Sequence, residues 1–374
     1  MKAFEPATML AEDWRNGLFL GRIETAEGPT PVLLKGGVLH DMSRVAPTAA
    51  QLVADRAFDA SAGSALGDLG SLTPRLLSPV DLQCVKAAGV TFAVSAVERV
   101  IEERARGDAS KAAKVRAMLE GRIGGGIRGL KPGSSEAMAL KQALIDEGMW
   151  SQYLEVAIGP DAEIFTKSPV LSTVGWGAEI GVRSDSSWNN PEPEIAILSD
   201  SHGKPVGASL GNDVNLRDFE GRSALLLGKA KDNNASCSLG PFVRLFDASF
   251  TMDDVRNAEI DLLIEGEDGY VLKGHSSMRE ISRDPTDLVA QAMSEHHYPD
   301  GYILFLGTLF APTQDRDDPG RGFTHKVGDI VSISTPKLGK LVNRVTHSKS
   351  AAPWTLGISG LMQNLAARGL LGAR

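Results

Sequence analysis

The chain has 374 residues, of which 42% are apolar and 23% are charged, and its formal net charge is −8. These values are typical of a globular protein, and the acidic balance argues against nucleic acid as the main partner. No apolar run approaches the roughly 18–20 residues that cross a bilayer, and the first residues lack the apolar core of a secretory signal. Cys84 and Cys237 are too few for a disulfide framework. We therefore expect a cytoplasmic protein without a membrane partner.

The first part of the chain is expected to form a small α/β domain over residues 1–80. A short strand at 31–34 precedes a Gly-Gly turn, and residues 48–58 have the pattern of a helix. A further strand is predicted at 85–92. We assign residues 81–374 to one larger domain.

Residues 93–134 are predicted to form a flap over a pocket. Apolar residues three or four apart predict a helix at 93–119, whereas the glycine-rich run 124–133 cannot lie inside a helix. Ser134 is the expected cap of a second helix, at 136–147. Two helices joined by a glycine connector are typical of a segment that closes over a bound substrate.

Strand patterns dominate residues 165–344, where turns rich in glycine, asparagine and proline separate them. One helix interrupts these strands, with Asp284 as its expected cap and Pro285 at its first position. We therefore predict an α+β fold in which a twisted, mixed β-body carries peripheral helices. The predicted strands are 196–198, 242–246, 259–264, 270–272, 302–306 and 330–335.

Two acidic residues at the start of one of these strands are the strongest candidates for a metal site. Glu192 and Glu194 alternate, so a strand points both carboxylates to the same face. Two anions side by side are unfavourable unless a cation or a proton neutralises them. Asp213 ends another β-prone run and offers a third carboxylate. Three carboxylates without a nearby His or Cys suit Mg²⁺ or Mn²⁺ better than zinc.

An ordered set of motifs around these carboxylates resembles the fumarylacetoacetate hydrolase superfamily. The resemblance covers roughly residues 80 to 345, and its spacings are most similar to those of the 2-keto-3-deoxypentonate (arabinonate or xylonate) dehydratases. The matching segments are Ala88–Phe92 with Ser95 and Arg99, Glu163–Lys167, Glu192-Pro193-Glu194, Gly211–Asp218 with Glu220-Gly221, Lys231 ahead of Gly240-Pro241, Ser276-Ser277, Gly307-Thr308 and Gly328-Asp329.

This resemblance implies a mixed β-sheet roll or sandwich, with residues 81–374 as the catalytic domain, and a homodimer. It also implies a hydro-lyase that forms 2,5-dioxopentanoate and water from a 2-keto-3-deoxypentonate through a metal-stabilised enolate. Lys231, with its pKa lowered by burial and cationic neighbours, would remove a C3 proton. Glu163 would protonate the leaving hydroxyl, with its pKa raised by apolar neighbours. The implied substrate contacts are Thr308, Ser276, Ser277, Ser95 and Arg99.

Two other functions stay open on the sequence. Hydrolases of this superfamily pair a His with a Glu on a short lid helix, and residues 93–119 contain no histidine. A C–C bond hydrolase of acylpyruvates would therefore need a histidine from elsewhere, such as His275. A non-catalytic homologue that acts as a binding protein is the third reading. Among sugar acids we expect a pentonate to be preferred over a hexonate.

Overall fold

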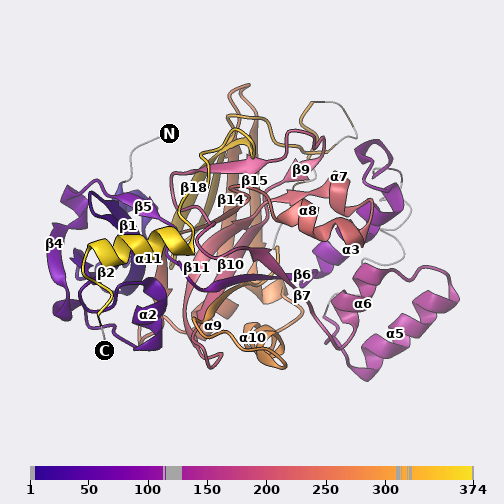
Figure 1. The fold of residues 1–374 in the computed structure, drawn as a ribbon. Helices are drawn as coiled ribbons and strands as arrows, with labels where there is room; N and C mark the ends of the chain where they lie inside the picture. The colour runs from indigo at the N-terminus through magenta and orange to yellow at the C-terminus, as the bar shows by residue number, and fades with distance from the viewer. Residues whose placement is uncertain are drawn as a thin grey trace.

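The computed structural model describes residues 5–112, 114, 129–308, 312, 314–317, 319 and 322–372 (Figure 1). Its largest element is an 11-stranded sheet with the strand order β4-β3-β2-β1-β13-β11-β10-β16-β6-β7, in which β5 also pairs with β1. These strands are β1 Leu18–Thr25, β2 Gly28–Lys35, β3 Val38–Asp41, β4 Ser64–Asp68, β5 Arg75–Leu77, β6 Cys84–Gly89, β7 Glu163–Ser168, β10 Pro193–Ser199, β11 Pro205–Asp213, β13 Cys237–Leu245 and β16 Tyr302–Phe305.

A second sheet packs against this one and encloses the main core. Its five strands run in the order β15-β14-β17-β18-β8. Ile195 and Ile197 of the large sheet share one buried cluster with Leu262 and Ile333 of the second sheet. The strands are β8 Glu179–Val182, β14 Glu259–Glu265, β15 Val271–Ser277, β17 Ile330–Thr335 and β18 Gly339–His347, and a small pair is formed by β9 Asn189–Asn190 and β12 Asn215–Leu216.

The N-terminal strands continue the large sheet. Strands β1 to β4 form an antiparallel meander, and Phe19 of β1 pairs with Arg244 of β13. Leu20 and Leu33 share a buried cluster with Leu198 of β10. The division at residue 80 stays a prediction, but a continuous sheet and a shared core cross it.

Helices lie at both ends of the molecule. The C-terminal helix lies beside the N-terminal strands (Figure 1), and there Asn364 donates a hydrogen bond to the carbonyl of Glu27 at 2.7 Å. Helices α3, α5 and α6 gather on the opposite side of the picture. None of the described helices is long and apolar enough to cross a membrane. The helices are α1 Pro6–Met9, α2 Ala49–Ala54, α3 Ala93–Ala105, α5 Ser135–Asp146, α6 Gln152–Ile158, α7 Arg217–Glu220, α8 Leu227–Lys231, α9 Met252–Arg256, α10 Pro285–Met293 and α11 Ile358–Ala367.

The predicted α+β architecture is confirmed, and several helix ends fall where the capping residues predicted them. Ser134 accepts a hydrogen bond from the backbone of Ala137, and Asp284 accepts one from Thr286. The predicted helix 48–58 is shorter, because the chain leaves the helix after Ala54. Residues 124–128 of the glycine-rich connector, and residues 113 and 115–119 of the predicted helix 93–119, lie outside the described residues.

Candidate active site and metal centre

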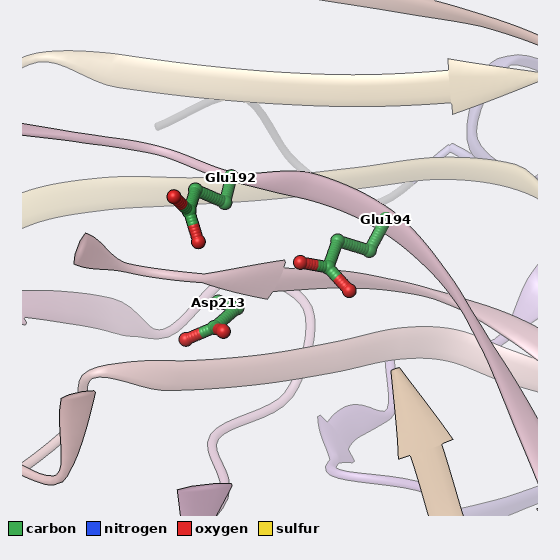
Figure 2. A group of neighbouring side chains, drawn as sticks. All are labelled: Glu192, Glu194 and Asp213. Carbon is green, nitrogen blue, oxygen red and sulfur yellow. The ribbon is translucent and has the colours of Figure 1, made fainter. Parts of the chain in front are cut away.

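Three carboxylates meet where strands β10 and β11 run side by side. Glu194 pairs with Gly211 across the two strands. The side chain of Asn212 accepts a hydrogen bond from the backbone N–H of Glu192 at 3.0 Å, and Asp213 donates its own N–H to the carbonyl of Glu192 at 3.1 Å. Ligand oxygens of Glu192, Glu194 and Asp213 lie within 4.8 Å of one another, and the side chains point toward a common space (Figure 2).

These carboxylates are almost completely withdrawn from water. Glu192, Glu194 and Asp213 are 2%, 1% and 2% exposed. Burial, together with the charges of Asp213 and Glu192, raises the pKa of Glu194 well above its usual range. Three buried anions in contact are unfavourable unless cations compensate them. The site therefore needs positive charge.

The backbone of Gly307 holds Glu194 in place. Its N–H donates a hydrogen bond to Glu194 at 2.8 Å. The φ angle of Gly307 is +102°, and a Cβ there would collide with the hydroxyl of Thr91. Glycine is required at this strand end because another side chain would be strained and would not fit.

Two buried lysines supply part of the positive charge. Lys167, whose side chain is fully buried, places its ammonium 2.7 Å from Asp213. Lys231, at the end of α8, contacts Glu192 and lies 3.0 Å from Asp213. Burial opposes ionisation of Asp213, but the two lysines outweigh it and hold the pKa of Asp213 below its usual value.

The protonation of Lys231 differs from the sequence prediction. Burial favours the neutral amine, but the charges of Asp213 and Glu192 outweigh it and raise the pKa of Lys231. The pKa of Lys231 is therefore raised where the sequence predicted a lowering. Lys231 is also 3% exposed, which excludes the solvated turn that its neighbours in the sequence would otherwise suggest.

One face of helix α3 closes the site from another side. Ser95 donates its hydroxyl to the carbonyl of Thr308 at 2.9 Å. One turn further, Arg99 pairs with Glu192, with Glu102 at 2.6 Å and with Glu220 at 3.0 Å. Arg99 therefore links the first glutamate of the candidate metal centre to a helix of the predicted flap.

Together these side chains enclose one pocket. Five carboxylates and two cationic groups line it, and the ammonium of Lys167 lies 2.7 Å from Asp213, so the carboxylates exceed the cations by two when every one of these groups is ionised. A divalent cation would neutralise that excess, and three oxygen ligands are the donor set of a hard ion. The free volume is only about 10 Å³, room for a water molecule. The lining residues are Ala88, Gly89, Val90, Ser95, Arg99, Glu163, Phe165, Glu192, Glu194, Asp213, Glu220, Lys231 and Thr308.

Glu163 has the protonation that was expected of it. It begins strand β7, and Phe165 lies on the same face two residues later. Burial and the charge of Glu220 raise the pKa of Glu163 to about 7. The carboxyl group can therefore hold a proton near neutral pH.

Ser276 and Ser277 are not at this pocket. Both lie on β15, an edge strand of the second sheet, and the hydroxyl of Ser277 is bonded to Glu259 at 2.8 Å. The structure of the chain does not support the expected substrate contacts for these two serines. His275 on the same strand is exposed and contacts Asp261, and no histidine is among the described residues that line the pocket.

Three buried residues of the site had no role assigned from the sequence. Lys167 alternates with Glu163 and Phe165, and a strand places such residues on one face. This alternation was the feature of the sequence that could have indicated Lys167. Glu102 lies one helical turn beyond Arg99, at a spacing that places both on one face. Glu220 was part of a matching motif, but nothing in its spacing showed that it reaches the pocket.

Comparison with known proteins gives two curated relatives. The chain is 33% identical over 186 residues to a 2-dehydro-3-deoxy-D-arabinonate dehydratase of Saccharolobus solfataricus. The aligned region covers 49% of this chain and 58% of the relative. It is 31% identical over 201 residues to a probable 2-keto-3-deoxyxylonate dehydratase of Haloferax volcanii, with 54% and 66% covered. The match spans less than two thirds of either relative.

Solved structures give the same fold. A 2-keto-3-deoxyarabinonate dehydratase superposes with a TM-score of 0.62 at 23% identity and covers 88% of this chain and 98% of its own. A 2-keto-3-deoxy-D-arabinonate dehydratase complexed with magnesium and 2,5-dioxopentanoate gives 0.61 at 22% identity, with 89% and 99% covered. A profile of the fumarylacetoacetate (FAA) hydrolase C-terminal family matches residues 141–346, more than half of the chain. The chain therefore belongs to the fumarylacetoacetate hydrolase family, as its motifs predicted.

Proposed function

We propose that this protein is a metal-dependent dehydratase that converts a 2-keto-3-deoxypentonate into 2,5-dioxopentanoate and water. The observation that carries the proposal is one enclosed pocket that holds three clustered carboxylates, a buried lysine and a glutamate with a raised pKa. The names of both curated relatives support the same reaction class.

The proposed metal is Mg²⁺, or Mn²⁺, with Glu192, Glu194 and Asp213 as its ligands. The donor set and the excess of two negative charges fit such an ion. Once bound, it would polarise the 2-keto group of the substrate as a Lewis acid and neutralise the charge that keeps Lys231 protonated.

The protein's own groups then have distinct roles. Lys231, as a neutral amine, removes a proton from C3, and Glu163 gives its proton to the hydroxyl that leaves C4 as water. A proton then leaves C5 and a proton returns to C3, which moves the double bond from C3–C4 to C4–C5. The resulting C5 enol gains a proton at C4 and loses its hydroxyl proton, which gives the terminal aldehyde. Thr308, at the strand end, holds the substrate carboxylate. Ser95 and Arg99 hold helix α3 against the pocket through their contacts with Thr308 and Glu192.

A product assay tests this proposal against the alternatives. The protein with Mg²⁺ would be given the D and L forms of 2-keto-3-deoxypentonate, a 2-keto-3-deoxyhexonate and an acylpyruvate in parallel. We expect 2,5-dioxopentanoate from a pentonate, less turnover of the hexonate in line with the expected preference for a pentonate, and none of the acylpyruvate. Pyruvate formation from the acylpyruvate would support the hydrolase instead, and no product from any substrate would support a binding protein.

Metal dependence and the roles of single residues need matched variants. Excess chelator should abolish turnover, and Mg²⁺ should restore it. Glu163→Gln should lose turnover by about 10²–10⁴-fold, as expected for a general acid. Lys231→Met should do the same, whereas Lys229→Met, an exposed lysine of the same helix, should retain activity. Full activity in chelator would refute the metal-dependent mechanism.

We also propose that the protein is a cytoplasmic homodimer, as the family resemblance implies. Light scattering at micromolar concentration tests the mass of the particle, and a fluorescent fusion tests the location. A monomer mass would refute the dimer.

A further inference from the structure

Gly89 and Glu163 face each other across two neighbouring strands. Gly89 ends β6, Glu163 begins β7, and the two are direct partners in the antiparallel register. Side chains of such partners lie on the same face of a sheet, with Cβ atoms about 4.5–5.5 Å apart. Both residues line the pocket.

The side chain of Glu163 occupies the space above Gly89. A Cβ built on Gly89 would lie 2.7 Å from Cδ of Glu163 and 3.4 Å from its Cγ, and closer still to one carboxylate oxygen. Real Cβ atoms essentially never approach another heavy atom within 3.0 Å. Any side chain at position 89 would therefore move the carboxyl group from its place.

The backbone does not explain the glycine. Gly307 has a positive φ, but Gly89 does not have a φ in the range that side chains avoid. The left-handed conformation follows one residue later, at Val90 with φ of 56°. Alanine could take the backbone conformation of residue 89, so the constraint comes from the neighbouring carboxyl group.

We propose that Gly89 is a positioning residue for the dehydration, because its missing side chain leaves the space in which the carboxyl group of Glu163 is held. This inference rests on the proposed role of Glu163 as the acid. The position of the acid then depends on the absence of a side chain at residue 89.

Gly89→Ala tests the inference without removing any polar group. The carboxyl group is the end of a flexible side chain, so it should shift while the fold is kept. A shift of about 1 Å in a catalytic group costs on the order of 10²-fold in rate. We expect kcat to fall by about this factor, KM to change by less than about threefold, and the thermal midpoint to stay close to that of the unaltered protein, whereas Gly360→Ala should leave kcat unchanged. Gly360 lies in α11, where a Cβ meets only one atom, at 3.5 Å.

A double-mutant cycle separates positioning of Glu163 from other effects of the added methyl group. In the Glu163→Ala background no carboxyl group remains to be displaced, so Gly89→Ala should lower kcat by less than about twofold. An undiminished loss in that background would overturn the inference, since the methyl group would then act on something other than Glu163.

A crystal structure of Gly89→Ala gives a readout that does not depend on the reaction. A displaced Glu163 carboxyl group supports the inference, and an unmoved one overturns it. If the unaltered protein dehydrates no 2-keto-3-deoxypentonate, the proposed function fails. The crystal structure then still decides whether Gly89 sets the position of Glu163.

Discussion

Replacing Lys231 by methionine should make the protein bind Mg²⁺ more tightly while turnover is lost. The ammonium of Lys231 contacts Glu192 and lies 3.0 Å from Asp213, so it neutralises two of the three proposed ligands. A cation that binds there is repelled by this ammonium. Methionine has a similar length and no charge, which makes it the suitable replacement.

The size of the effect follows from the distances. The ligand oxygens lie within 4.8 Å of one another and the ammonium is 3.0 Å from one of them, so a bound ion would lie about 5 Å from Lys231. At an effective dielectric constant of about 20, two unit charges at that separation repel by about 3 kcal/mol, and the double charge of Mg²⁺ raises the repulsion to about 7 kcal/mol. Rearrangement of the surrounding groups removes much of this repulsion, but a remaining difference of about 1.4 kcal/mol already corresponds to a tenfold change in affinity. We therefore expect the Kd for Mg²⁺ to fall at least about tenfold.

Titration calorimetry with Mg²⁺ measures this directly. The unaltered protein, Lys231→Met and Lys229→Met would be compared at one pH and ionic strength, with circular dichroism as the check on folding. Lys229 is exposed on the same helix, so its replacement should leave the affinity unchanged. A folded Lys231→Met variant that binds Mg²⁺ no more tightly than the unaltered protein would refute the reasoning.

Three further predictions concern pH, stability and a distant serine. Because the pKa of Glu163 is raised to about 7, its proton is present below that pH and lost above it. In a pH–rate profile kcat should therefore fall as the pH rises through about 7. Glu220→Gln removes a charge that raises this pKa, so the fall in kcat should move to lower pH. Lys167→Met should lower the free energy of unfolding in urea by about 3 kcal/mol, since it removes one partner of a buried ion pair, and Mg²⁺ should restore part of the loss. Ser277→Ala should retain full turnover and lose only about 1 kcal/mol of stability with its hydrogen bond to Glu259, and a large loss of kcat would contradict its placement outside the pocket.

Local patterns explain which parts of the fold could be predicted. The alternation of Glu192 and Glu194 requires only the period of a strand, and Ser134 and Asp284 act through contacts with residues two or three positions away. These features were therefore visible in the sequence. Strand order was not, because the pairing of Phe19 with Arg244 joins residues that are far apart along the chain. The resemblance supplied the architecture that the local patterns could not.

The same distinction holds within the site. Glu163, Phe165 and Lys167 alternate in the sequence, so a strand there places them on one face, although neither this strand nor a role for Lys167 was predicted. Ser276 and Ser277 were connected to the site only by motif order. Order along the chain does not fix distance in space, and these serines lie on an edge strand of the other sheet.

The charge state of Lys231 shows why chemistry cannot be inferred from identity alone. Burial would lower the pKa of an isolated lysine, and for this reason Lys231 was expected to act as a base. Asp213 and Glu192 reverse that effect, because their attraction for the ammonium in a buried pocket exceeds the cost of removing the ammonium from water. In the proposed mechanism the lysine therefore acts as a base only when the carboxylates beside it are neutralised. A metal requirement and the activation of Lys231 are then two consequences of one charge balance, which is why removal of this lysine should strengthen metal binding and abolish turnover in the same variant.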